Sequence, residues 1–304
     1  MKTSTISTCL GLALSLTTGC VGSAYDGGSD DNILGGSVDY GDPAVGAIRY
    51  MDATGAEYIC SGTLVSPRLL VSAGHCAVPA AYDVSFDTNP NLAAPIGTQG
   101  WITASAIASP LYDGNGADGH DVSVILLSKA VTTTLPVPLG GTPAQGSTLR
   151  AVGYGMNVNG DDGTGAGVKR QVNVAVDAVA THEIVTGQQG QGTCHGDSGG
   201  PFFDAGGNLV ATTSYGDDAT CDGDGHEMRI DDNLDFINQY IAFTSGAGGG
   251  GSTTTQQCDS DVNGNEVKCT GGSCTCLVNG QEVGTCTASD PSTACSIPGD
   301  CCGF

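Results

Sequence analysis

The stretch Gly196-Asp197-Ser198-Gly199-Gly200-Pro201 decides how the rest of the chain is interpreted. A serine between glycines is a candidate nucleophile because a backbone without side chains turns tightly and exposes the hydroxyl. It also lets a substrate carbonyl approach the backbone N–H groups. Taken alone, the same residues would be only a glycine-rich turn, so the interpretation needs support from other segments.

Two other segments supply that support. Ser72-Ala73-Gly74-His75-Cys76 places a histidine beside a cysteine, and His120-Asp121 precedes the apolar run 122–127. The order His, Asp, Ser is that of chymotrypsin-type enzymes. On these motifs the chain resembles the secreted serine proteases of the trypsin/chymotrypsin family, over about residues 33–244.

The resemblance implies an all-β fold of two antiparallel six-stranded β-barrels with a C-terminal helix. The residue patterns indicate strands at 58–65, 69–72 and 101–108, and Val172, Val174 and Val176 alternate as a half-buried strand. Residues 136–140 resemble the family's crossing between the barrels, and 151–155 the opening of the second barrel. Asp231 and Asp232 can cap a helix that packs on the second barrel.

The resemblance also implies a catalytic role for each motif. His75 would take the proton of the Ser198 hydroxyl, and Asp121 would accept a hydrogen bond from the His75 ring. The N–H groups of Gly196 and Ser198 would form the oxyanion hole. His120 is interpreted as a neighbour without a catalytic role.

The substrate-binding residues implied by the resemblance are Gly192, Ser214, Tyr215, Gly216 and Gly225. A trypsin-like enzyme would carry an aspartate at the position of Gly192, so strict specificity for lysine or arginine is not expected. Four aspartates are expected to crowd the pocket rim, with Glu227 close by. The rim aspartates are Asp217, Asp218, Asp222 and Asp224.

Two disulfides and an activation step are further implications. The disulfides are Cys60–Cys76 behind the histidine and Cys194–Cys221 along the pocket wall. A cut before Ile33 would free an α-amino group to pair with the buried Asp197, which implies a zymogen. Because Asn32 precedes the cut, a trypsin-like activator is not expected. Lys169-Arg170, at the end of a loop resembling the family's self-cleaved loop, is the expected site of nicking by a basic-specific protease.

Composition limits the partners. The chain of 304 residues has a net charge of −23, so nucleic acid is excluded as a partner. The resemblance implies protein or peptide substrates, with protease inhibitors as further candidates. We expect no metal and no cofactor, and a monomer.

The two ends of the chain are predicted to lie outside the protease domain, 33–244. Residues 1–24 resemble a signal peptide and 25–32 a short propeptide, although Cys20 lies in a weak lipobox that would instead anchor a bacterial envelope form. Release from the cell is favoured. Residues 245–257 are a Gly/Ser/Thr linker. Residues 258–304 contain eight of the 14 cysteines and predict a small disulfide-rich module.

Two features of that module leave alternatives open. The segments 262–267 and 278–283 repeat, each with an Asn-Gly turn signal, which predicts two small hairpins. Residues 259–264 match the first half of a calcium loop, but Thr270 stands where the glutamate ligand should be. The functional alternative to a protease is a non-catalytic surface-binding protein on a protease scaffold, with this tail carrying adhesion to a surface or polymer ligand.

Overall fold

The computed structural model describes residues 33–52, 54–78, 80–156, 165–187, 190–244, 256–257, 265–270, 273–278 and 281–287. The predicted signal peptide with Cys20, the propeptide, most of the linker and the calcium-loop match lie outside the described residues. Within the described part, no helix is long and apolar enough to cross a membrane.

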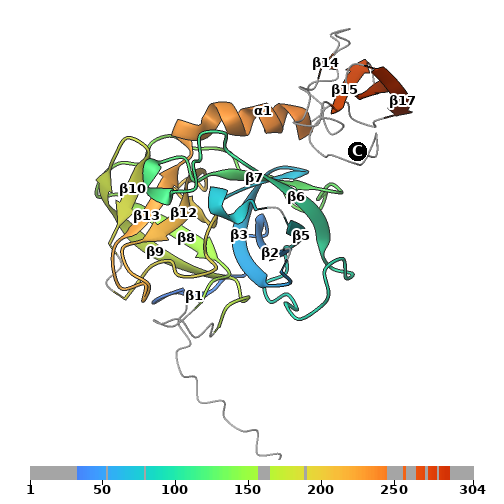
Figure 1. The fold of residues 1–304 in the computed structure, drawn as a ribbon. Helices are drawn as coiled ribbons and strands as arrows, with labels where there is room; N and C mark the ends of the chain where they lie inside the picture. Colours follow the sequence, from blue (N-terminus) through green and yellow to red (C-terminus); the bar gives the residue numbers. More distant parts are fainter. Residues whose placement is uncertain are drawn as a thin grey trace, which may run out of the picture. The chain divides into compact units, whose positions relative to one another are not determined.

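Six strands form the first closed barrel, in the order β2-β3-β4-β7-β6-β5 (Figure 1). Every pairing is antiparallel, and the barrel closes where β5 returns to β2. Aliphatic side chains such as Ile48, Leu64, Leu70 and Ile125 fill the interior and are fully buried. The strands are β2 (Val45–Asp52), β3 (Glu57–Ser66), β4 (Leu69–Ser72), β5 (Ala80–Ser85), β6 (Ile102–Ala108) and β7 (Ser123–Leu127).

The second barrel closes in the same way, with β1 (Ser37–Val38) added on the outside of β9. Along β9 the valines at 172, 174 and 176 are buried, while residues 173 and 175 are exposed, as the alternation predicted. The expected all-β fold with two six-stranded barrels is therefore confirmed. The strands of the ring are β8 (Thr148–Gly153), β9 (Arg170–Val179), β10 (Glu183–Thr186), β13 (Gly225–Arg229), β12 (Leu209–Gly216) and β11 (Pro201–Phe203).

The C-terminal helix is present, but two details differ from the prediction. The helix α1 (Leu234–Thr244) contacts β3 and β4, so it packs on the first barrel as well as the second. Its Ile237 belongs to a core cluster with residues of both barrels. Asp231 and Asp232 do not cap α1; they lie in the short 3₁₀ turn η3 (Asp231–Asn233) and bind Arg229 and His182 instead.

The dibasic pair is not an open cleavage site, which corrects the sequence-based expectation. Lys169 is 2% exposed and Arg170 6% exposed, at the start of β9. The Lys169 ammonium donates to the carbonyl of Asp42 at 2.6 Å, and Arg170 donates to the carbonyls of Gly165 and Val168. A protease would have to unfold this segment before it could cut.

The tail contains a separate antiparallel sheet of four strands in chain order. Val278 pairs with Gln281, which leaves two residues, Asn279 and Gly280, between the strands, as expected for an Asn-Gly hairpin. The strands are β14 (Gln256–Gln257), β15 (Asn265–Thr270), β16 (Ser273–Val278) and β17 (Gln281–Thr287).

Candidate active site

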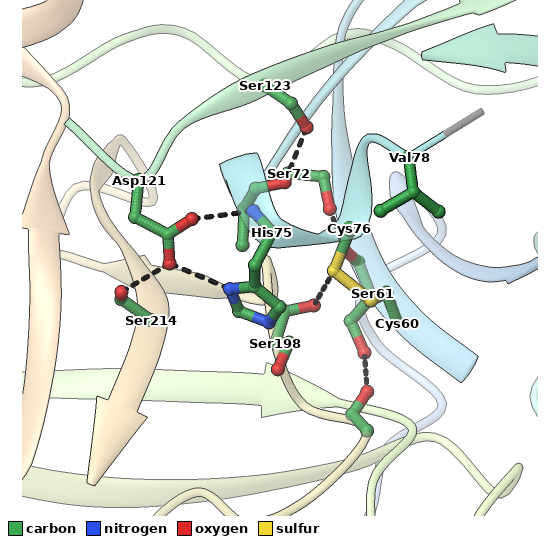
Figure 2. The surroundings of a disulfide bond; sticks show 12 residues. Cys60, Ser61, Ser72, His75, Cys76, Val78, Asp121, Ser123, Ser198 and Ser214 are labelled. Carbon is green, nitrogen blue, oxygen red and sulfur yellow. Dashed lines mark hydrogen bonds and ion pairs between the residues drawn. A yellow bond between two sulfur atoms is a disulfide. The ribbon is translucent and has the colours of Figure 1, made fainter. Parts of the chain in front are cut away.

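The residues of the three motifs come from both barrels. His75 lies on the 3₁₀ turn η1 (Gly74–Cys76) after β4, and Asp121 comes directly before the first-barrel strand β7. Ser198 lies on the loop before the second-barrel strand β11. A disulfide between Cys60 and Cys76 joins β3 to the histidine turn. Figure 2 shows the His75 ring between the Asp121 carboxylate and Ser198.

Asp121 is 1% exposed and accepts three hydrogen bonds. The backbone N–H of His75 donates to Oδ1 at 2.7 Å, and His75 Nδ1 lies 2.7 Å from Oδ2. The Ser214 hydroxyl donates to the same Oδ2. Burial raises the pKa of Asp121, but the hydrogen bonds and the nearby imidazole outweigh it and hold the pKa below its ordinary value. An ionised Asp121 fixes the proton on His75 Nδ1, so that Nε2 can act as a base.

The backbone around Ser198 is held from both sides. Its carbonyl accepts from the backbone N–H of Ser61 at 2.8 Å, and the Ser61 hydroxyl donates to the carbonyl of Gly196 at 3.0 Å. Gly196 has a φ of 94°, in the left-handed region that favours glycine. Among the described residues, the N–H groups of Gly196 and Ser198 and the Ser198 hydroxyl donate to no acceptor. Two N–H groups in one tight loop are thus left for an incoming oxygen.

A cavity of about 410 Å³ opens beside these groups. Ser214, Tyr215 and Gly216 of the predicted set line it, at the end of β12. Gly192 and Gly225 are buried and are not part of the cavity wall; Gly192 bridges to Leu34, and Gly225 pairs with Thr186 and Gly216. The cavity is lined by His75, Thr193, Cys194, His195, Ser198, Thr213, Ser214, Tyr215, Gly216, Asp217, Asp218, Ala219, Cys221 and Gly223.

The cavity wall is braced and carries acidic groups. Cys194 and Cys221 form a disulfide that lies in the wall. Of the predicted rim aspartates, Asp217 and Asp218 reach the cavity. Tyr215 stacks on His226 with ring centroids 4.3 Å apart. These features give the cavity a negative rim and one aromatic side.

Asp197 is fully buried beside Ser198, and its carboxylate accepts hydrogen bonds from the backbone. The N–H groups of Gly155 and Cys194 bind its two oxygens at 2.7 and 2.9 Å. A Cβ on Gly153 would come within 2.1 Å of Asp197, so glycine is required for this close approach. Burial raises the pKa of Asp197 to about 7 despite these hydrogen bonds. The site therefore contains a fully buried carboxylate whose pKa stays raised although the charges of Arg170 and His195 lower it in part.

Ile33 is also fully buried, and it packs with apolar residues of the second barrel. Its φ of 21° is an outlier for a β-branched residue. Leu34 bridges to Gly192 directly after it. The start of the described chain is thus anchored in the second barrel through a strained residue.

The sequence did not predict the hydrogen bonds that two serines make in the site, and it placed a third residue, Glu227, only approximately. The hydroxyls of Ser61 and Ser214 act on the Gly196 carbonyl and on Asp121, and the one signal was the position of Ser214 in the predicted substrate strand. Glu227 was expected near the pocket; it is fully buried on β13, and Thr186 donates to its Oε1 at 3.1 Å. Burial raises the pKa of Glu227 well above its ordinary value.

Comparison with known proteins identifies the family to which this fold and site belong. A model described as Trypsin matches residues 37–237. The chain belongs to the trypsin family. The trypsin-family domain includes both barrels, the cavity and all three motif residues, and homologues in this family are serine endopeptidases.

Individual relatives agree with that assignment. Brachyurin from Leptuca pugilator is 30% identical to the trypsin-family domain over 205 residues, which cover 62% of this chain and 89% of brachyurin. A trypsin from Saccharopolyspora erythraea is 30% identical over 183 residues, which cover 53% of this chain and 77% of that trypsin. The structure of neuropsin, a serine protease of mouse brain, matches with a TM-score of 0.57 and 22% identity, over 69% of this chain and 100% of neuropsin. Because the sequence identity to neuropsin is 22%, this match shows similarity of fold alone.

Proposed function

We propose that this chain is a secreted serine endopeptidase that uses His75, Asp121 and Ser198. The observation that carries the proposal is the hydrogen-bonded set His75–Asp121–Ser214 at the mouth of the cavity that Ser198 also lines. A binding protein on the same scaffold would have no need for an ionised, buried aspartate that orients a histidine beside a serine. The non-catalytic alternative is therefore not favoured.

The proposed mechanism uses the His75 imidazole, the Ser198 hydroxyl and the two N–H groups of the serine loop. His75 Nε2 takes the proton of the Ser198 hydroxyl as the oxygen attacks the scissile carbonyl, and Asp121 stabilises the imidazolium that forms. The N–H groups of Gly196 and Ser198 receive the developing oxyanion. His75 then protonates the leaving amine, and water repeats the sequence on the acyl-enzyme.

Activation by a cut before Ile33 is part of the proposal. The buried Asp197 needs a cation, and a new ammonium at Ile33 would supply one. The φ of Ile33 is defined by its bond to residue 32, so cutting that bond removes the constraint on this torsion. The φ outlier at Ile33 and the raised pKa of Asp197 both favour a zymogen interpretation.

Specificity that is not strictly for lysine or arginine is supported by the cavity lining. Thr193, Thr213 and Gly216 are small or neutral, so medium-sized apolar side chains fit the cavity. The rim residues Asp217 and Asp218 favour basic residues at neighbouring positions of the substrate. Protein substrates are expected, and protease inhibitors would occupy the same cleft of a monomeric enzyme.

The ends of the chain complete the proposal. Residues 1–24 direct secretion, which agrees with the disulfides in the domain. The linker 245–257 and the module 258–304 hold the enzyme on a surface or polymer. Deleting 245–304 should then leave peptide hydrolysis intact and abolish retention on an insoluble substrate; loss of hydrolysis would contradict the two-module arrangement.

A fluorophosphonate probe tests the catalytic proposal. The intact mass of the secreted protein is measured before and after treatment, with Ser198→Ala as the control. We expect one adduct on a species that begins at Ile33 and none on the control. A correctly processed species without an adduct would contradict the proposal.

A further inference from the structure

Two histidines and an aspartate meet on the surface next to the triad. His120, His182 and Asp232 each present one ligand atom, and these atoms lie within 4.8 Å of one another. His182 Nδ1 is 2.7 Å from Asp232 Oδ2, and His120 Nδ1 is 4.0 Å from the same oxygen. The two rings lie with centroids 4.9 Å apart. We propose that these three side chains form a binding site for a divalent cation of the zinc class.

The distances between the three ligand atoms suit such an ion after small movements of the side chains. Two ligands of a tetrahedral zinc, each at about 2.0–2.1 Å, are about 3.3 Å apart. The pair His182–Asp232 has to open slightly, and the pair His120–Asp232 has to close slightly. Imidazole nitrogens with one carboxylate oxygen are ligands that zinc and related transition metals prefer. Two other His/Cys clusters in the described part have both cysteines in disulfides, so they are not ligand sets of this kind.

The backbone that carries the ligands is fixed. The Arg229 side chain donates to the carbonyls of Ala180 and Thr181 at 2.9 and 2.8 Å, and its backbone N–H donates to the carbonyl of His182 at 2.9 Å. The same guanidinium binds Asp231, the neighbour of Asp232, at 2.6 Å. Arg229 therefore holds the turn of His182 and the turn of Asp232 in one arrangement.

The third ligand is brought close by a glycine. Gly119 has a φ of 93°, and a Cβ there would lie 2.3 Å from Cβ of His182. Any other residue at this position would push the His120 loop away from His182. His120 Nδ1 also lies 3.4 Å from Oδ1 of the buried Asn233, an acceptor, so this nitrogen gives up its proton and that contact when it binds the ion.

The site is open enough for exchange and favourable in charge. The side chains of His120, His182 and Asp232 are 21%, 41% and 26% exposed, so water can complete the coordination. The chain carries a net charge of −23, which raises the local concentration of cations. The proposed site departs from the sequence-based expectation that no metal is bound and that His120 is only a neighbour.

The ion would join the two barrels. His120 belongs to the loop that leads into β7 of the first barrel, whereas His182 precedes β10 and Asp232 lies in η3, after β13 of the second. Asp121 is the next residue after His120. Bound metal should therefore stabilise the barrel arrangement that brings His75 and Ser198 together, and it should bind only the folded chain.

Metal titration of the full chain tests the site. The Ser198→Ala form, which prevents self-digestion, is stripped with EDTA and titrated with Zn²⁺ by calorimetry and thermal unfolding. We expect one equivalent of Zn²⁺ and a Tm that rises with Zn²⁺ concentration. His120→Asn and His182→Asn should each weaken binding by about 10-fold or more, since even partners behind a ligand cost that much. His195→Asn is the matched control for an exposed histidine.

A second readout separates metal binding from a plain hydrogen bond. Co²⁺ should give visible absorption bands that Asp232→Asn removes, although asparagine can still bond to His182. If His182 and Asp232 form only a hydrogen bond, the variants lower the Tm of the metal-free protein and Zn²⁺ changes nothing. That result, or an equal Zn²⁺ effect in all variants including His195→Asn, would overturn the proposal.

Discussion

Two buried aspartates of the site differ in how their charge is compensated. Asp121, between the barrels, has donors from His75 and Ser214, and its pKa is lowered. Asp197, inside the second barrel, has two backbone N–H donors, and burial raises its pKa to about 7 although the charges of Arg170 and His195 lower it in part. The interactions of Asp121 therefore compensate its charge more fully than those of Asp197 do. Under the proposed activation, folding alone builds the surroundings of Asp121, whereas Asp197 gains a cationic partner only after the cut before Ile33.

The largest expected effect is the loss of kcat when Asp121 is replaced. Asp121→Asn keeps the size of the side chain but lets the amide donate to His75, which reverses the tautomer and protonates the nitrogen that should act as base. We expect kcat of the cut enzyme to fall about 10⁴-fold. Peptide hydrolysis measures it, and Asp235→Asn on the exposed face of α1 serves as the control. A fall of only a few-fold would mean that Asp121 does not orient His75.

Asp197→Asn should act in opposite directions before and after the cut. In the cut enzyme it leaves the Ile33 ammonium buried without a partner, which should lower the free energy of unfolding by about 3–5 kcal/mol. In the uncut chain at neutral pH it removes a buried carboxylate whose pKa is raised to about 7, and it should be neutral or stabilising. Urea unfolding of both forms, in the Ser198→Ala background, measures the contrast. Equal effects in both forms would rule out pairing between Ile33 and Asp197.

The sequence predicted most of what local pattern and motif can determine. The alternation of valines at 172–176 located β9, and the apolar run after Asp121 located β7. The motif residues His75, Asp121 and Ser198 were placed by resemblance; the structure brings His75 and Ser198 to one cavity and bonds Asp121 to His75. These features depend on short stretches of chain.

What the sequence did not predict depends on contacts between distant segments. The exposure of Lys169 and Arg170 was expected from a polar, glycine-rich neighbourhood, but Asp39 and Asp42 bury the lysine from far away in the chain. Asp231 and Asp232 follow the rule for helix caps, yet Arg229 and His182 outcompete the helix for them. In both cases, residues from other segments determine the burial or the hydrogen bonding of the side chain.

The pH dependence of stability should also distinguish the two aspartates. Because the folded-state pKa of Asp197 is raised to about 7, its contribution is fully present below the ordinary value of the unfolded chain and is lost as pH rises toward 7. The pKa of Asp121 is lowered, so its contribution is present above the unfolded value and is lost as pH falls through the folded value.

Urea unfolding of uncut Ser198→Ala protein between pH 4 and pH 7 measures how the contribution of Asp197 to stability changes with pH. The pKa of Asp197 lies at the upper end of that window. We expect the free energy of unfolding to contain a component that falls over this range, and Asp197→Asn should remove it. Because burial also raises the pKa of Glu227, Glu227→Gln is the matched control for a second buried carboxyl. If the slope is unchanged in Asp197→Asn and disappears in Glu227→Gln, the comparison drawn for Asp197 is wrong.

The smallest effect is expected when Asp121 loses one of its three hydrogen-bond donors. Ser214→Ala removes the hydroxyl that donates to Asp121 but leaves both bonds from His75. Hydrogen bonds to charged groups contribute about 1.5–3 kcal/mol, so the free energy of unfolding at neutral pH should fall by that amount. Activity should fall far less than in Asp121→Asn, because the orientation of His75 is kept. Since Asp121 loses a stabilising donor, its pKa should rise, and the acid side of the stability profile should move to higher pH. An unchanged profile would mean that the two His75 bonds alone hold the Asp121 charge.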